Sequence, residues 1–95
     1  MKYLHTMIRV TELDRSLRFY TEGLGFQLVR RSDYEKDRFT LVFLRASGDP
    51  ESAMIELTHN WDTHAYQRGN AYGHVAYRVT RLKPFRVTCA KKAMT

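Results

Sequence analysis

The stretch His5-Thr6-Met7-Ile8-Arg9-Val10-Thr11-Glu12-Leu13 returns 69 positions later as His74-Val75-Ala76-Tyr77-Arg78-Val79-Thr80-Arg81-Leu82. Both copies read His-x-x-x-Arg-Val-Thr-x-Leu, an in-register match of five positions in nine that composition alone would rarely give. If each copy is a β-strand, side chains two apart share a face. The histidine and the arginine of each copy then point the same way. The chain is therefore predicted to start the same strand twice.

The positive charge of the chain is concentrated at its C-terminal end. Of the net charge of +6, residues 1–80 account for only +1, with eleven Lys or Arg and all ten Asp or Glu, whereas residues 81–95 hold five Lys or Arg and no acid. A nucleic-acid-binding face needs positive charge on the folded body, so we do not expect nucleic acid as a partner. No apolar run approaches the roughly 18 residues of a membrane span.

A chain of 95 residues can form one small domain with a modest core. A single cysteine, Cys89, excludes an internal disulfide and fits a reducing compartment. The N-terminus enters the first predicted strand without a basic-then-apolar leader. We therefore expect a cytoplasmic protein, and we expect Cys89 to be incidental.

Hydrophobic patterning predicts one βαβββ module of an α+β fold. The stripe Leu13, Leu17, Tyr20 and Leu24 favours a helix ending near Glu22, with Thr11 or Asp14 as candidate N-caps. Strands are predicted at 3–10, 26–31, 39–45 and 53–58, with a polar turn at 32–38 and loops at 47–51 and 59–70. The repeat adds only the first strand of a second module, so the expected division is an incomplete domain over 1–82 and a basic tail of uncertain structure over 83–95.

Three residues make a candidate metal site: His5, Glu56 and His74. Neutral imidazoles and a carboxylate suit nickel, zinc, cobalt or iron. Glu56 stands between two apolar residues of its strand, and a carboxylate there must be paired, solvated or bound to a metal. An exposed strand face explains Glu56 equally well, and a single histidine is more often structural or solvated than a ligand. The repeat favours the metal reading, because both imidazoles recur with an arginine four positions on.

Arg9 and Asn60 are candidate substrate-binding residues. The planar guanidinium of arginine suits a carboxylate, although Arg9 could equally form a salt bridge within the sheet. Asn60 could present its amide to a polar ligand or simply serve a turn. His59 and His64 are expected on the loop surface. The sequence contains no glycine-rich phosphate loop, CxxC pair or nucleophile elbow.

Three segments of the chain closely resemble one enzyme family. HTMIRVTELDRSLRFYTEGLGFQLVRR (residues 5–31), AMIELTHNW (53–61) and AYGHVAYRV (71–79) are similar to bacterial glyoxalase I, the lactoylglutathione lyases of the vicinal oxygen chelate superfamily. The resemblance covers residues 1 to about 80. It implies paired βαβββ modules and a homodimer whose metal sites lie between modules of the two subunits.

The resemblance also implies roles for the candidate residues. His5, Glu56 and His74 fall on three metal ligands, and Arg9 and Asn60 fall on residues that hold the glutathione portion of the substrate. The family isomerises the hemithioacetal of glutathione and methylglyoxal to S-lactoylglutathione, and the bacterial type favours nickel, with zinc or cobalt as alternatives. Asn60-Trp61 and the AYGH segment favour glyoxalase over other superfamily members, such as dioxygenases or thiol transferases.

The chain departs from the family pattern at its C-terminal end. The family's general acid/base glutamate lies in the last strand of the second module, and no acidic residue follows Asp62 here. We therefore expect a chain that is truncated or altered after about residue 80, in which Glu56 is the remaining candidate catalytic carboxylate and turnover is poor or absent. The alternative is a non-catalytic metal- or ligand-binding fragment that oligomerises.

Overall fold

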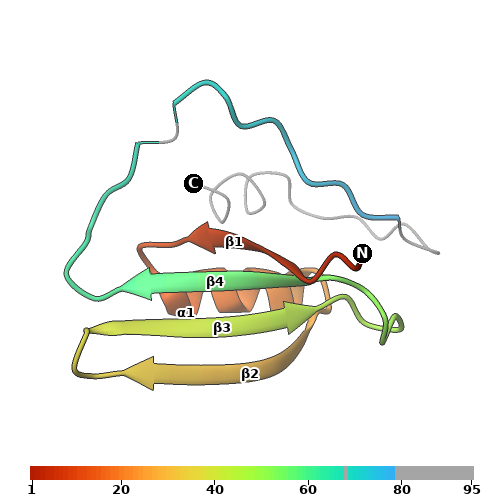
Figure 1. The fold of residues 1–95 in the computed structure, drawn as a ribbon, viewed down its shortest axis with the longest axis horizontal. Helices are drawn as coiled ribbons and strands as arrows, with labels where there is room; N and C mark the ends of the chain where they lie inside the picture. The colour runs from red at the N-terminus through yellow and green to blue at the C-terminus, as the bar shows by residue number, and fades with distance from the viewer. Residues whose placement is uncertain (68, 79–95) are drawn as a thin grey trace.

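The fold is a four-stranded sheet with a helical segment against one face (Figure 1). The computed structural model describes residues 1–67 and 69–78. In chain order the elements are β1 (His5–Arg9), α1 (Leu13–Arg18), the π-helical η1 (Phe19–Gly23), β2 (Gln27–Tyr34), β3 (Phe39–Arg45) and β4 (Met54–Asn60). The strand order is β1-β4-β3-β2, with β1 parallel to β4 and the other pairs antiparallel. The expected βαβββ module is therefore confirmed.

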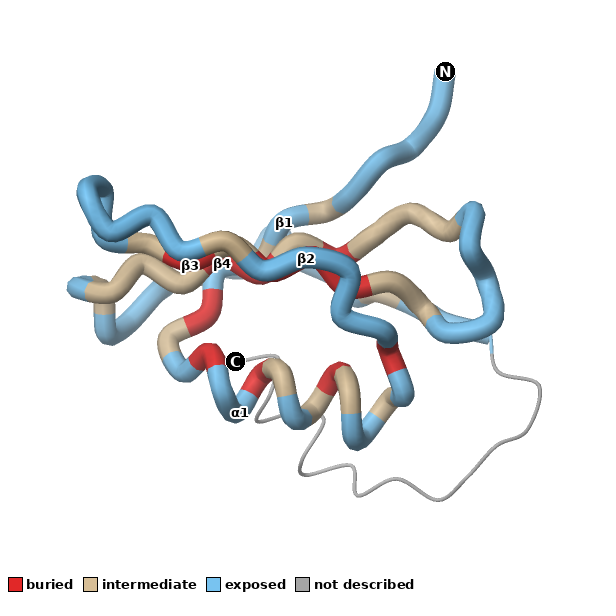
Figure 2. The backbone as a smooth tube through the Cα atoms, turned by 90° about the horizontal axis from the view of Figure 1, so that it is seen from below, coloured by how far each residue is buried: buried red, intermediate tan, exposed pale blue. Residues whose placement is uncertain are grey.

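The helical segment packs against one face of the sheet, and the core lies between the two (Figure 2). Val42 and Leu44 of β3 and Leu57 of β4 are fully buried there. The predicted helical stripe meets them, with Leu13 and Tyr20 buried and Leu17 and Leu24 packed at the margin. Because side chains alternate along each strand, burial of these residues turns their neighbours to the opposite face. We call that opposite side of the sheet the open face.

The helical segment differs from the single regular helix that was predicted. It begins as α1, and then widens into η1, where the Leu24 amide donates to the Phe19 carbonyl over 3.0 Å. Glu12 occupies the N-cap position and no side chain caps the helix, so the capping expected from Thr11 or Asp14 is wrong. Thr11 stands one residue too early and Asp14 lies within the first turn. Gly25, with φ +76°, then turns the chain towards β2.

Strand pairing extends two strands beyond their predicted ends. Residues 32–34 were expected in a turn, but they pair with residues 39–41 and prolong β2 to Tyr34. A register shift between Leu28 and Arg30 lets β2 continue along β3. β4 likewise reaches Asn60 because His59 and Asn60 pair with the first residues of β3. Both extensions have polar side chains, so hydrophobic patterning did not predict them. The hydrogen bonds that form them come from the backbone.

The second copy of the repeat does not form a strand over its described part. Residues 71–78 are irregular, and the remaining residues 79–82, with the tail 83–95, lie outside the described part of the chain. A strand needs a hydrogen-bonded neighbour, and no described strand pairs with residues 74–78. The prediction of a strand at 74–78 is therefore wrong for this structure. The ring of Tyr77 instead packs edge-on against Phe26 at 5.1 Å between centroids.

Within the described residues, no helix has the length and apolar character that crossing a membrane requires.

Truncation of a fully buried leucine should test the one-sided core. Leu57→Ala is expected to lower the free energy of unfolding by about 2–5 kcal/mol, because it removes packed methyl groups and leaves a cavity. Leu28→Ala is the matched control: this side chain is 48% exposed, and its loss should change stability by less than about 1 kcal/mol. Equal losses for both variants in urea unfolding would contradict the assigned core.

Tyr20 should make stability fall at alkaline pH. Burial raises the pKa of the Tyr20 phenol to about 12 from its ordinary 10.0. A folded-state pKa above the unfolded value means that its contribution is intact below pH 10 and is lost as pH rises towards 12. At pH 11 the loss should be about 1.4 kcal/mol, the equivalent of one pKa unit, and it should approach about 2–3 kcal/mol only above pH 12. Tyr20→Phe should remove this component in urea unfolding at pH 7 and pH 11; an unchanged difference between the two pH values would argue against it.

Candidate functional site on the open face of the sheet

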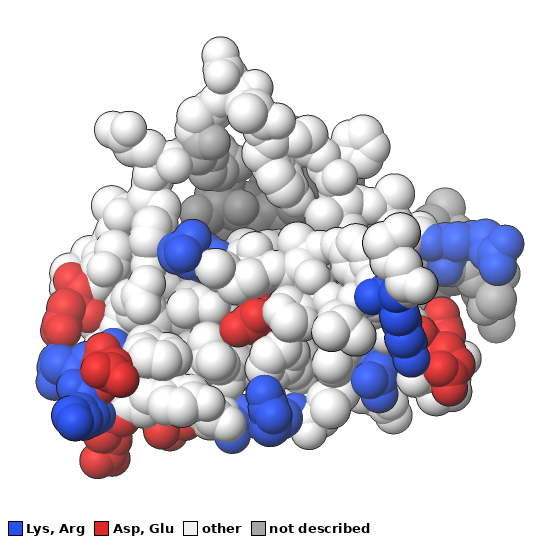
Figure 3. Space-filling model, viewed as in Figure 1, with Lys and Arg blue, Asp and Glu red and all other residues white. Residues whose placement is uncertain are grey.

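The open face carries most of the residues that the sequence singled out. Figure 3 views the molecule from this side: charged side chains lie mainly around its margin, and an acidic group lies near the middle. The outward positions follow from the alternation opposite the buried residues of each strand. They are His5, Met7 and Arg9 on β1, Glu56, Thr58 and Asn60 on β4, and Leu41, Phe43 and Arg45 on β3.

His5 and Glu56 meet at the centre of this face. The His5 Nε2 atom lies 3.1 Å from Glu56 Oε1. Glu56 pairs in register with Met7, so His5 reaches it diagonally across the parallel β1–β4 ladder. The Glu56 side chain is only 13% exposed and that of His5 is 38% exposed. The ring of Phe43 contacts His5 edge-on at 5.4 Å between centroids and provides an apolar wall beside the pair.

His74, the third predicted ligand, is not part of this cluster. It lies in the irregular segment 71–78 and is exposed. Among the described residues, no group of three or more His, Cys, Asp or Glu side chains could hold a metal ion. One chain thus brings together two of the three predicted ligands, and the assignment of His5, Glu56 and His74 as a metal site stays a prediction.

The geometry of the His5–Glu56 pair suits two ligands of one divalent cation. Ligands at about 2.1 Å from the same ion lie about 3.0–3.4 Å apart, depending on the coordination angle. The observed separation of 3.1 Å between the nitrogen and the oxygen falls in that interval. An imidazole with a carboxylate is also a donor set that nickel, zinc and cobalt accept. The pair therefore fits part of a metal site, and further ligands must come from other groups.

Arg9 and Asn60 lie on the open face on one side of Glu56. Arg9 pairs in register with Thr58, and Asn60 ends β4 two residues further on. Arg9 is exposed and takes part in none of the ion pairs among the described residues. The Asn60 side-chain amide donates to the Tyr66 hydroxyl over 3.1 Å, which leaves its carbonyl oxygen for another partner. Both residues can therefore present polar groups to a ligand that reaches across the face from Glu56.

The loop after Asn60 is fastened to the sheet by contacts that the sequence did not reveal. Arg38 Nε and Nη2 donate to the two carboxylate oxygens of Asp62 over 2.7 and 2.9 Å. The hydrogen bond from Arg38 lowers the pKa of the Asp62 carboxyl. Trp61 donates its backbone amide to the Arg38 carbonyl and its indole N–H to the Thr40 hydroxyl. These contacts fix the end of β4, and hence Asn60, relative to the β2–β3 turn.

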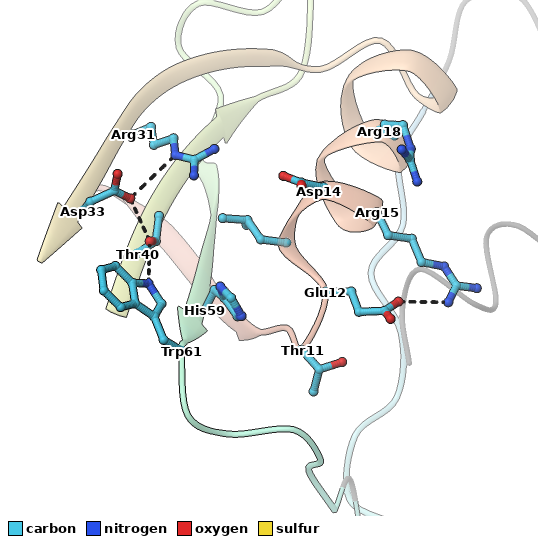
Figure 4. A pocket seen from close by; sticks show the side chains of 11 residues that line it. Thr11, Glu12, Asp14, Arg15, Arg18, Arg31, Asp33, Thr40, His59 and Trp61 are labelled. Carbon is cyan, nitrogen blue, oxygen red and sulfur yellow. Dashed lines mark hydrogen bonds and ion pairs between the residues drawn. The ribbon is translucent and has the colours of Figure 1, made fainter. Parts of the chain in front are cut away.

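A separate pocket of about 650 Å³ opens on the helix side of the sheet (Figure 4). Its charged and polar lining includes Asp14 from α1, Arg31 and Asp33 from β2, and His59 from β4. The Thr40 hydroxyl donates to Asp33 over 2.7 Å within it. His59 was expected on a loop surface, and this is wrong: extension of β4 places it in a strand, facing the pocket. The pocket shares no lining residue with the His5–Glu56 cluster.

This chain belongs to the Glyoxalase/Bleomycin resistance protein/Dioxygenase superfamily, whose family model matches residues 2–91. Within it, the chain is similar to lactoylglutathione lyases. It is 53% identical to the lactoylglutathione lyase of Neisseria meningitidis serogroup A over 79 residues, covering 83% of this chain and 57% of that protein. It is 52% identical to the probable lactoylglutathione lyase of Synechocystis over 79 residues, covering 83% and 60%.

The solved structures agree with this relationship. Glyoxalase I of Leishmania major, described as trypanothione-dependent, superposes with a TM-score of 0.75 at 47% identity, covering 83% of this chain and 57% of that one. The expected resemblance to glyoxalase I and the expected fold are thereby confirmed. The chain spans somewhat more than half the length of these relatives.

Loss of the Thr40 hydroxyl should loosen the segment that carries Asn60. Thr40→Val would leave the Trp61 indole N–H without its acceptor and would leave the Asp33 carboxylate with only its 3.7 Å contact to Arg31, at a cost of about 1–3 kcal/mol in unfolding free energy. Trp61 is the single tryptophan, so its fluorescence in urea reports the change directly. Thr40→Ser keeps the hydroxyl and should retain most of the stability. A Val variant as stable as the Ser variant would count against the network.

Proposed function

We propose that this chain is a lactoylglutathione lyase module, which isomerises the hemithioacetal of glutathione and methylglyoxal to S-lactoylglutathione. The observation that carries the proposal is the His5–Glu56 pair at the centre of the open face. Relatives that are about 50% identical over 83% of the chain are lactoylglutathione lyases or probable ones, which supports the same reaction. The product of such a reaction is no longer a reactive dicarbonyl adduct, so the module would serve methylglyoxal detoxification.

A divalent metal, nickel first and zinc or cobalt as alternatives, is the proposed cofactor. His5 and Glu56 would hold it, and it would act as a Lewis acid where negative charge develops on substrate oxygens. His74 is proposed as a third ligand. Because one chain leaves His74 apart from the pair, we propose that His74 is supplied by a second copy in a homodimer. A shared site of this kind would make metal binding depend on association.

The residues of the open face can be given roles in the isomerisation. The reaction moves a proton from the carbon that bears sulfur to the neighbouring carbon, and no oxidant or reductant is needed. Of the two acidic residues in the four strands, only Glu56 lies on the open face, so it is the candidate carboxylate for that transfer. Arg9 and Asn60 would hold the glutathione portion, because their guanidinium and amide suit its charged end. Phe43 would help to keep water from the reacting carbons.

The second candidate function is a non-catalytic metal- or ligand-binding module that oligomerises. It is favoured by the finding that a single chain assembles two donors and not three among its described residues. The two functions share the metal site and the dimer, and they differ only in turnover. In either case we propose a cytoplasmic protein, in line with its single cysteine.

Nickel binding and turnover should be measured together on the 95-residue chain. We expect nickel binding by calorimetry and nickel-dependent isomerisation of the hemithioacetal, followed by ultraviolet absorbance. His5→Ala should weaken nickel binding at least tenfold and abolish turnover, since it removes one of few ligands. His64→Ala, a change at an exposed loop histidine, is the control and should alter neither. Nickel binding without turnover would favour the second function, and loss of neither property in His5→Ala would refute both.

A mixing experiment tests whether the site is shared. In a mixed dimer of His5→Ala and His74→Ala chains, one site would keep every ligand and the other would lose two. Random pairing should therefore restore about a quarter of the sites, although each variant alone is inactive. Recovery of nickel binding on mixing supports a site between copies. No recovery, with a dimer demonstrated by ultracentrifugation, would place His74 outside the metal site.

A further inference from the structure

Three arginines of the open face have no carboxylate partner within the part of the chain that the structure describes. Arg9, Arg30 and Arg45 occur in none of the ion pairs among the described residues. Every Asp and Glu of the chain lies in residues 12–62, and all of these positions are described. The acidic side chains of the chain are thus all accounted for without pairing these arginines. The open face offers cationic groups that only another molecule, or the chain's own terminal carboxylate, could neutralise.

The strand register places these arginines on opposite sides of Glu56. Arg9 pairs with Thr58, two residues beyond Glu56 along β4. Arg45 pairs with Met54, two residues before Glu56. Two residues of a strand cover about 7 Å, so Arg9 and Arg45 belong to different ends of the face. Arg30 pairs with Phe43, which itself pairs with Glu56, so Arg30 lies level with Glu56 on β2, across the sheet from Arg9 on β1.

Arg30 pairs with Phe43, Arg45 lies two residues after Phe43 on β3, and each guanidinium has a feature that favours binding an anion. The Arg30 guanidinium carbon lies 4.7 Å from the centroid of the Phe43 ring, a cation–π contact that orients it. The Arg45 Nε atom is buried and has no hydrogen-bond partner among the described residues. A buried donor without an acceptor is unfavourable. A carboxylate can accept from Nε and a terminal nitrogen of one guanidinium at once, which would satisfy that atom.

We propose that Arg30 and Arg45 form a second anion subsite, which binds the glycine carboxylate of the glutathione portion. This rests on the proposed function and assigns a specificity role to residues that the predicted site did not include. Glutathione carries a carboxylate at each end of its central cysteine, and a sulfur near Glu56 would send these ends to opposite sides. The glutamyl end also bears an ammonium group, which two arginines would repel. The glycine end bears a carboxylate alone, so the all-cationic subsite fits it.

The test compares two ligands and four variants of the 95-residue chain by calorimetry. The ligands are S-hexylglutathione and its monoethyl ester at the glycine carboxylate. Arg45→Gln and Arg30→Gln should each weaken binding of the acid about tenfold, as expected for loss of a charge-assisted hydrogen bond. Neither change should alter binding of the ester. Arg31→Gln is the matched control, because Arg31 pairs with Val42 on the helix side and lies beside Asp33.

The remaining variant separates the subsite from the function on which it rests. Arg9→Gln should weaken both ligands equally, since it belongs to the glutamyl end. The subsite would be overturned if Arg45→Gln and Arg30→Gln bound the acid as tightly as the unchanged chain does. It would also be overturned if either variant lost the same affinity for the acid and for the ester.

If the unchanged chain binds neither ligand, the proposed function fails, and succinate then tests the anion subsite alone. Arginine Nε–H signals followed by NMR during a succinate titration should shift for Arg30 and Arg45 and stay fixed for Arg31. Unmoved Arg30 and Arg45 signals would overturn the subsite as well.

Discussion

The pairing of β3 with β4 is the constraint on which the remaining structure depends. Val42 pairs with Leu57 and Leu44 with Ile55, and these residues form the centre of the core. A slip of one residue in this ladder would turn the whole apolar set towards the open face. The register is therefore fixed by burial. It follows that Phe43 and Glu56, which also pair, must point away from the helix.

The position of Glu56 is thus a consequence of packing on the opposite side of the sheet. Its carboxylate is 13% exposed although it lies outside the core. A carboxylate with so little access to water needs a partner, and His5 provides one. His5 arrives because β1 joins β4 in parallel, and a parallel pair requires a crossover connection. The helical segment and the strands β2 and β3 supply that connection, so the elements that build the core also bring the imidazole to the carboxylate.

The two faces of the sheet are held together by different kinds of interaction. The helix side is held together by apolar packing, with the hydrogen bonds from Trp61 to Thr40 and from Thr40 to Asp33 at its edge. The open face combines the His5–Glu56 pair and the Phe43 ring with arginines that form no ion pair among the described residues. We therefore assign stability mainly to the packed helix side, and ligand binding to the open face, where Arg9, Arg30 and Arg45 form no ion pair among the described residues. The paired hydrogen bonds from Arg38 to Asp62 anchor the chain next to Asn60, which lies on the open face.

The sequence by itself determined the order of the elements from β1 to β4, the apolar stripe of the helix and the face on which His5, Arg9 and Glu56 lie. Alternation along a strand and the stripe along a helix are local properties, so the residues carry them wherever the elements go. The resemblance to glyoxalase I also followed from short segments, and the family match confirmed it.

Only the tertiary structure decided which of these residues meet. The 3.1 Å approach of His5 to Glu56 depends on the register of two strands about 50 positions apart in the sequence. The extension of β2 to Tyr34, the placement of His59 and the contacts of Trp61 arise from backbone pairing that polar side chains conceal. Residues 74–78 share the His-x-x-x-Arg pattern of β1, yet they form no strand, because no described strand pairs with them. A pattern specifies which face a residue occupies, whereas its partners depend on segments that are distant in the chain.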